Sequence, residues 1–302
     1  MKTLTIGTLL GASLLLGACK KSTDSGSATT AEEAKKSDTH VLATKGSKFP
    51  AKGASRKSES VIETKDAKMN IEAAGQKMDG TMNTSETSVE TWVSLGDNKA
   101  RRTLESKVTT GAMTMNGQDQ PMPQEKDALI GVPVLVEFKN GSYVATLESG
   151  TPTADQTKAL EKLNESGKND SDFEMYGDTP RKVGDKWNVD PKKLSGFGEA
   201  KDLTGTFTTE FVEIKDFQGT PCAVLKSKFD LSGGADMGAS PDAKMKVTLK
   251  GDATSYRSLA DKTDLEAKIN ATMTMEGSPN PQVKMNMEGP FSMSQKNTIK
   301  KP

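Results

Sequence analysis

The sequence is poorest in the residues from which many catalytic sites are built. Its 302 residues include one histidine, His40, and two cysteines, Cys19 and Cys222. Catalytic triads need a histidine in the folded domain, and zinc sites need several histidines or cysteines close together. No glycine-rich phosphate loop is present either. We therefore expect a protein that is not an enzyme and that has no metal or organic cofactor.

The chain also has little net charge and few aromatic residues. Its 41 lysines and arginines balance 41 aspartates and glutamates. Nucleic-acid binding relies largely on cations that neutralise phosphates, so this balance predicts no nucleic-acid partner. Hydrophobic residues make up 33% of the chain and aromatics 5%, which is little for one thick, enclosed core. The composition favours sheets with one apolar face and one wet face.

The start of the chain has the order of an export signal. Lys2 precedes an apolar stretch up to Leu16, and Gly17 and Ala18 come directly before Cys19. The segment Leu16-Gly17-Ala18-Cys19 resembles the lipobox of bacterial lipoproteins. This resemblance implies that the signal peptide, residues 1–18, is removed and that Cys19 then carries a covalent lipid. The alternatives are a plain secretory signal and a transmembrane anchor, for which about 20 apolar residues are needed.

The lipobox resemblance also implies a location and a membrane contact. A lipid on Cys19 would anchor the chain to a membrane of the bacterial cell envelope. Lys20, rather than an aspartate, follows the cysteine, and by resemblance to Gram-negative sorting rules this implies the outer membrane. Residues 19–57 are rich in Ser, Thr, Ala, Lys and Glu, and they predict a disordered tether. We expect a folded β-rich domain over 58–296 and a C-terminal tail over 297–302.

Within the predicted domain, apolar residues recur at every second position. Met69 and Ile71 alternate with polar residues, and so do the residues from Leu265 to Met275 and from Val283 to Met293. Alternation of this kind predicts antiparallel strands with one polar face. We expect a mainly β fold: an antiparallel meander that forms a curved sheet or open barrel, with one or two short helices.

Two turns predict the register of hairpins. Asn140-Gly141 is a strong type I′ turn signal and places Phe138 opposite Tyr143, with Val136 opposite Ala145 and Val134 opposite Leu147. Gln218-Gly219 predicts a second hairpin, with Val212 opposite Leu225 and Ile214 opposite Ala223. The alternation then slips, which a bulge near Phe211 would explain.

Helix signals occur at two places. Thr153 to Gln156 form a capping box before the apolar positions Ala159, Leu160 and Leu163, and Gly167 is a suitable end. Asp190-Pro191 predicts a short helical turn. By contrast, Asp170, Asp172 and Glu174 have calcium-loop spacing without the glycine and distal glutamate of such loops, so we expect a solvated acidic loop.

Methionine is the unusual residue of this chain. Among 15 methionines, several form doublets two residues apart, and these share a strand face. Flexible thioether side chains fill irregular cores, and they can also line a pliable apolar pocket. The methionines occupy the apolar positions of their strands, so we expect them to fill the core; alternatively, Met273, Met275, Met285, Met287 and Met293 line such a pocket. The weaker alternative is a copper site made by Met273, Met275, Met285 and Met287, since thioethers are ligands for Cu(I).

Cys222 and the segment around Trp187 are two further features of the sequence. Once Cys19 carries a lipid, Cys222 is the sole remaining thiol, and we expect it to be a small buried side chain. Pro180, Val183, Gly184, Asp185 and Trp187 form a segment similar to one in uncharacterised envelope lipoproteins of unknown function. That resemblance implies no activity. Trp187 is expected to anchor the next strand in the core.

The sequence leaves three functions open. The first is a membrane-anchored envelope lipoprotein that binds a hydrophobic ligand, such as a lipid, or an envelope partner without catalysing a reaction. The second is a methionine-based copper-handling protein. The third is a structural surface lipoprotein without a small ligand.

Overall fold

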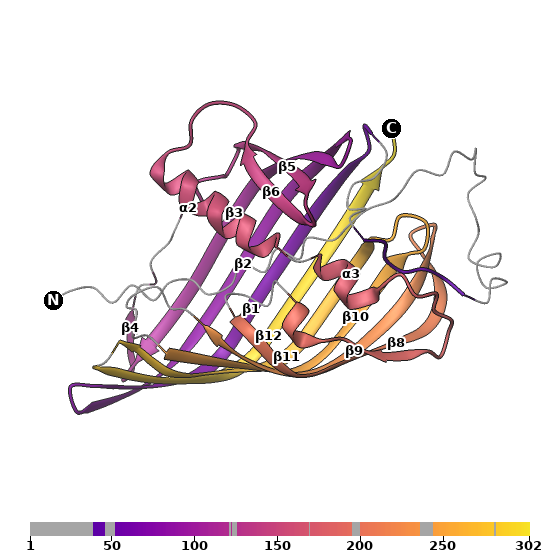
Figure 1. The fold of residues 1–302 in the computed structure, drawn as a ribbon. Coiled ribbons are helices and arrows are strands. Elements are labelled where there is room, and N and C mark those ends of the chain that lie inside the picture. Colours follow the sequence, from indigo (N-terminus) through magenta and orange to yellow (C-terminus); the bar gives the residue numbers. More distant parts are fainter. Residues whose placement is uncertain are drawn as a thin grey trace.

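A computed structural model describes residues 39–45, 52–120, 122, 126–168, 170–194, 200–235, 244–280 and 282–302. These residues form one curved antiparallel sheet of 12 strands with two short α-helices and one 3-10 helical turn (Figure 1). The predicted fold class is therefore confirmed. The elements are β1 (Ser55–Ala73), β2 (Gln76–Gly96), β3 (Lys99–Met115), β4 (Gln118–Gln120), β5 (Pro133–Lys139), β6 (Ser142–Leu147), α2 (Ala154–Ser166), α3 (Ser171–Tyr176), β7 (Lys186–Asn188), η1 (Pro191–Lys193), β8 (Ala200–Phe217), β9 (Thr220–Ala235), β10 (Lys244–Ser258), β11 (Asp264–Asn280) and β12 (Val283–Lys300).

The sheet consists of two meanders that meet in its middle. The strand order is β6-β5-β3-β2-β1-β12-β11-β10-β9-β8-β7, with the short β4 beside β3. The first and last long strands, β1 and β12, pair with each other, so both ends of the domain lie at the centre of the sheet. Among the described strands the order ends at β6 and β7 without closing. Between these two edges the chain crosses one face of the sheet through α2 and α3 (Figure 1).

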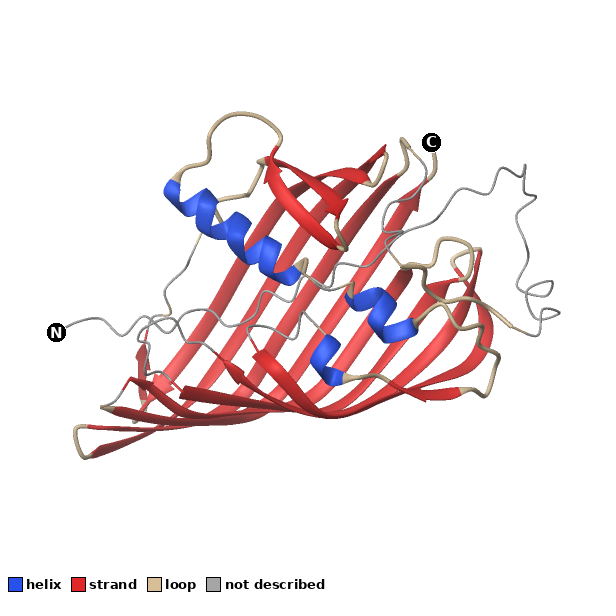
Figure 2. Ribbon diagram, viewed as in Figure 1, coloured by secondary structure: helices blue, strands red, loops and turns tan. Residues whose placement is uncertain are grey.

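The crossing segment defines the two faces of the sheet. Figure 2 shows α2, α3 and η1 over the concave face, which we call the inner face. Side chains of each long strand alternate between this face and the outer one. In β12, Met285, Met287 and Phe291 are buried, whereas Lys284, Asn286 and Glu288 are exposed. This strand has 18 residues and is about 60 Å long at the usual rise per residue, so one face offers a long row of side chains.

The hairpin predicted from Asn140-Gly141 has the expected register. Val134 pairs with Leu147, Val136 with Ala145, and Phe138 with Tyr143. Both turn residues have positive φ, 52° and 84°, as a type I′ turn requires. The apolar side of this hairpin packs with Trp92 and with Leu160 of α2. The capping box at Thr153 is present, and Gly167 caps the end of α2 as predicted.

The second hairpin has the predicted bulge near Phe211, but one predicted pair is wrong. Ile214 pairs with Ala223 as expected, but Leu225 pairs with Phe211 rather than with Val212. The register shifts between Phe211 and Glu213, so Val212 is the extra residue of a β-bulge. The bulge allows Phe211, whose side chain is fully buried, and Ile214 to lie on the same side.

The segment of Asp170, Asp172 and Glu174 is not a solvated acidic loop. Residues Ser171–Tyr176 form α3, and the Asp170 carboxylate accepts a hydrogen bond from the Phe173 backbone N–H at the start of this helix. Asp172 is buried because it pairs with an arginine from a distant strand, which spacing in the sequence does not indicate. At Asp190-Pro191 the predicted helical turn is present as η1.

The ordered domain extends beyond its predicted limits of 58 and 296. Strand β1 begins at Ser55, and β12 continues to Lys300 through most of the predicted C-terminal tail. Residues 39–45, expected in the tether, contact the domain: Leu42 and Ala43 are buried, and the Ala43 N–H donates to the Gly177 carbonyl oxygen at 3.1 Å. The signal peptide and Cys19 lie outside the described residues. No helix in the described part of the chain has the length and hydropathy of a membrane-spanning helix.

Candidate functional site

Strand register brings the methionines together at one end of the inner face. We call this group the methionine patch, and it spans β3, β2, β1, β12, β11 and β10. Its members are Met69, Met78, Met82, Met113, Met115, Met245, Met273, Met275, Met285 and Met287. The patch contains most of the predicted lining residues. Met293 lies farther along β12, opposite Ile62 and Ile269, so it is on the same face but outside the patch.

The centre of the patch is a row of directly paired methionines. Met287 of β12 pairs with Met69 of β1 on one side and with Met275 of β11 on the other. Neighbouring strands are about 4.8 Å apart, so these side chains are in contact range of one another. Their relative exposures are 2–3%, which places them among the most buried residues of the sheet.

Few described residues from outside the sheet cover this apolar face. The large core cluster that contains the patch is formed almost entirely by strand residues. In the described part of the chain, Met175, Val189 and Leu194 are the members contributed by segments between strands. An apolar sheet face of this size is normally buried against a second layer. The methionine patch is the largest group of flexible side chains on this apolar face, and we take it as the candidate binding surface.

Small residues surround the buried row. Gly80 pairs with Met69, and Gly289 pairs with Met273. A Cβ atom at Gly289 would lie 2.5 Å from the Cα and Cβ atoms of Ala67, so no larger residue fits there without movement of β1. Farther along the face, Ala253, Ile269 and Ala271 are only half-buried. An apolar strip accessible to solvent therefore continues beyond the patch.

The other end of the inner face is polar. On β12 the inward positions after Met293 are Gln295 and Asn297, and both are buried. The Gln295 Nε2 donates to the Ser58 hydroxyl at 2.8 Å, and the Asn297 Nδ2 donates to the Asp264 carbonyl oxygen at 2.7 Å. Neither side-chain carbonyl oxygen has a hydrogen-bond partner among the described residues. These residues were not predicted as site residues from the sequence, although they continue the inward alternation of Met285 to Met293.

Charged residues also occupy the polar end. Glu90 accepts hydrogen bonds from Trp92 Nε1 at 2.8 Å and from Arg102 Nε at 2.7 Å. The Arg56 and Arg102 guanidinium groups lie over the Trp92 ring at 5.3 and 5.8 Å. Burial raises the pKa of Glu90, but the arginine charges and these hydrogen bonds outweigh it and hold the pKa below its usual value.

Glu86 lies on the same strand and the same face, but its pKa is shifted in the opposite direction. Burial raises the pKa of Glu86 above its usual value, and the Lys107 ammonium at 3.3 Å offsets that effect only in part. Glu86 therefore ionises at a cost to the folded state, whereas ionised Glu90 stabilises it. The two carboxylates differ because Glu90 has two arginines and a tryptophan around it.

A buried ionic cluster closes the polar end beneath α3. The Arg257 side chain is fully buried and donates through Nη1 to Asp172 Oδ1 at 3.1 Å and through Nη2 to the other oxygen of that carboxylate. Its Nε donates to the Leu42 carbonyl oxygen at 2.7 Å, and Asp264 lies 3.4 Å from Nη1. Tyr176 lies over the guanidinium at 4.1 Å. The cluster thus ties residues 39–45, α3, β10 and β11 together.

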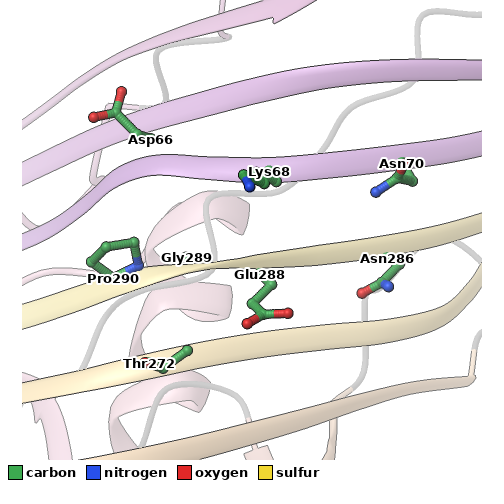
Figure 3. Close-up of a pocket in the computed structure, with 8 residues that line it drawn as sticks. All are labelled: Asp66, Lys68, Asn70, Thr272, Asn286, Glu288, Gly289 and Pro290. Carbon is green, nitrogen blue, oxygen red and sulfur yellow. The ribbon is translucent and has the colours of Figure 1, made fainter.

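A hollow of about 400 Å³ lies on the outer face at the β1 bulge (Figure 3). The register between β1 and its neighbours shifts between Thr64 and Lys68, and Asp66 has a φ of 48° there. Polar side chains of β1, β11 and β12 line the hollow: Asp66, Lys68, Asn70, Thr272, Asn286 and Glu288, beside Gly289 and Pro290. The bulge that produces the hollow also lets Ala67 approach Gly289 closely on the inner face.

Cys222 and Trp187, which the sequence interpretation also named, are both packed within the fold. Cys222 is fully buried, and burial raises the pKa of its thiol to about 12. Trp187 is half-buried and donates from Nε1 to the Met175 carbonyl oxygen at 2.9 Å. Its ring also lies under the Arg181 guanidinium. Among the described residues no three His, Cys, Asp or Glu side chains are grouped as a metal site would need.

Comparisons with known proteins give no family. No family model matches the chain, and no curated protein matches it. A structure of lipovitellin that concerns lipid–protein interactions is similar at a TM-score of 0.43 and 8% identity, over 82% of this chain and 25% of that one. The chain thus spans a quarter of the lipovitellin chain it matches.

Two bacterial structures are also similar at low scores. An outer membrane channel from Pseudomonas putida F1 matches at a TM-score of 0.24 and 11% identity, over 82% of this chain and 96% of that one. The translocator domain of the autotransporter NalP from Neisseria meningitidis matches at 0.20 and 11% identity, over 81% and 88% of the two chains. TM-scores this low do not establish a common fold, and none of these likenesses bears on the function.

Proposed function

We propose that this protein is a lipid-anchored protein of the bacterial cell envelope whose inner face binds a hydrophobic ligand without catalysing a reaction. The observation that carries the binding proposal is the methionine patch, where register gathers flexible thioether side chains from six neighbouring strands. The lipobox-like segment ending at Cys19 supports the anchor, and Lys20 supports the outer membrane as the location.

Methionine suits a ligand of irregular or variable shape. Its side chain is unbranched, has several rotatable bonds and adapts to different neighbours. A core that packs only against itself gains more from branched residues of defined shape, which specify a single arrangement. These features together favour an adaptable binding surface for acyl chains.

Native mass spectrometry of the mature protein, purified from its own membrane, tests both parts of the proposal. We expect a covalent mass increase at Cys19 and a separate, dissociable hydrophobic molecule. Met287→Gln places a polar side chain of similar length in the centre of the patch and should weaken retention at least tenfold. Val61→Gln, at an exposed position on the outer face of β1, is the control. A protein that carries no dissociable molecule and binds none from added lipid would contradict the binding proposal.

The second candidate function is Cu(I) binding, which the paired row of Met69, Met287 and Met275 favours. Thioether ligands suit Cu(I), and this row places several of them on adjacent strands. Titration against a chromophoric Cu(I) chelator measures the affinity. Met287→Leu should abolish binding and keep the core filled, whereas Met293→Leu should leave it unchanged. Equal copper affinity in both variants would exclude this function.

A further inference from the structure

The inner face changes from apolar to polar along single strands. On β12 the inward side chains are Met285, Met287, Phe291 and Met293, followed by Gln295 and Asn297. On β1 the same change occurs between Met69 and Ser58. The methionine patch and the polar end are therefore parts of one continuous surface. From Met287 to Gln295 the distance is about 26 Å at the strand rise, which suits a long acyl chain.

The polar end has hydrogen-bond acceptors that the protein itself does not use. Gln295 and Asn297 are 6% and 4% exposed, and the amide N–H groups of both are bonded within the fold. Their carbonyl oxygens, Oε1 and Oδ1, have no partner among the described residues. A buried acceptor without a donor costs free energy, so native structures rarely leave one unsatisfied. Two of them at adjacent inward positions indicate a site for a molecule with donors.

Small side chains flank Gln295 on both neighbouring strands. The residues directly opposite Gln295 are Ser60 on β1 and Ala267 on β11, which both have small side chains. Ala267 is half-buried and continues the accessible strip of Ile269 and Ala271. The amide of Gln295 therefore lies at the boundary between the apolar strip and the polar end.

The charged side chains near Gln295 and Asn297 indicate whether the bound headgroup is charged or neutral. At this end Arg56 and Arg102 lie beside Glu90, Lys107 pairs with Glu86, and Arg257 pairs with Asp172 and Asp264, so four cations face four carboxylates. Because these charges compensate each other, the acceptors of Gln295 and Asn297 favour uncharged donors over an anion. Hydroxyl and amide groups of a lipid headgroup are donors of this kind.

We infer that the ligand is an amphiphile with an uncharged, hydroxyl- or amide-bearing headgroup. The headgroup donates to Gln295 Oε1 and Asn297 Oδ1, and the acyl chain lies along Met293 and Phe291 toward the methionine patch. This inference rests on the proposed hydrophobic-ligand function and adds the headgroup class and its binding residues. It also assigns a direction to the ligand along the strands.

Binding of three probes that share one acyl chain tests the inference on the full-length protein. The probes are monooleoylglycerol, which has two hydroxyl donors, methyl oleate, which has none, and oleate, which is anionic. We expect the wild type to bind monooleoylglycerol at least tenfold more tightly than either of the others. Gln295→Met removes the acceptor and keeps the side-chain length, and it should erase that preference while methyl oleate binding stays unchanged.

Ser58→Ala is the matched control. It breaks the same Gln295–Ser58 hydrogen bond but keeps the Gln295 carbonyl, so the preference for monooleoylglycerol should persist. Equal affinities of the wild type for all three probes, tighter binding of oleate, or an unchanged preference in Gln295→Met would overturn the headgroup inference and leave the proposed function standing. If no probe binds, the proposed function itself fails. The wild-type comparison needs no variant, so misfolding of Gln295→Met would not prevent a decision.

Discussion

The two ends of the inner face use the same strands for different purposes. At the polar end, ion pairs and hydrogen bonds join segments far apart in the sequence, such as Leu42, Asp172 and Arg257. At the methionine end, the contacts are between flexible apolar side chains that have no directional preference. One end therefore holds the fold in a unique arrangement, while the other can adapt to an occupant.

The largest effect is expected when the polar end loses its buried cation. Arg257→Met leaves Asp172 and Asp264 buried without their positive partner, and breaking a buried pair in this way costs about 3–5 kcal/mol. Urea unfolding followed by tryptophan fluorescence measures the loss. Arg101→Met is the control, because its ion pair with Glu148 is on the surface and is worth about 1 kcal/mol or less. Similar losses for both variants would show that the Arg257 cluster does not hold the fold.

At the methionine end, volume should matter more than the identity of the side chain. Met287→Ala leaves a cavity and should cost about 2–5 kcal/mol. Met287→Leu conserves the volume and should cost less than about 1.5 kcal/mol. Thermal unfolding of the ligand-free protein measures both losses. If leucine costs as much as alanine, the patch is a rigid core and the contrast between the two ends fails.

The carboxylates of Glu90 and Glu86 on β2 should make the stability of the protein depend on pH in opposite ways. The pKa of Glu90 is lowered in the folded state, so its stabilisation is present above the unfolded pKa of about 4.3 and is lost as pH falls through the folded pKa. Glu90→Gln should therefore lower stability at pH 7 by about 1.5–3 kcal/mol, the usual worth of hydrogen bonds to a charged group. This deficit should shrink progressively as the pH falls below about 4.3.

Glu86→Gln should behave in the opposite way. The pKa of Glu86 is raised, so its favourable contribution is present at low pH and is lost as pH rises from about 4.3 through the folded pKa. The variant should gain stability relative to the wild type between pH 4 and pH 7, as measured by urea unfolding at each pH. A loss that grows with pH would mean that Lys107 dominates the environment of Glu86 instead of burial.

The smallest effect concerns Cys222. Burial raises the pKa of its thiol to about 12, so the folded protein at pH 8 should react with a thiol reagent orders of magnitude more slowly than the unfolded chain. Cys222→Ala should change neither ligand binding nor copper binding. Rapid modification of the native state would show that the sheet opens at β9.

Local patterns predicted much of this fold, and long-range pairings were beyond them. The register of β5 and β6 follows from the turn at Asn140-Gly141, and the capping box predicts α2, because neighbouring residues determine both. The pairing of β1 with β12 joins distant segments that no turn connects. For that reason the sequence alone did not show that Met69, Met275 and Met287 form one row.

Polar residues at the ends of the domain were the main source of error. Asn297 and the segment around Leu42 lie in polar stretches, which are typical of tails and tethers. Their order depends on partners far away: Asp264 for Asn297 and Arg257 for the Leu42 carbonyl. The same applies to Asp172, which only its pairing with Arg257 distinguishes from a solvated acid.

The most direct test of the binding face is NMR of the protein labelled at the methionine methyl groups with ¹³C. Single Met→Leu variants assign the signals, and monooleoylglycerol is then added, with glycerol as the control. We predict that the signals of Met69, Met275 and Met287 shift in a saturable manner with the lipid and do not move with glycerol. Unchanged signals for these three methionines at saturating lipid would contradict the account.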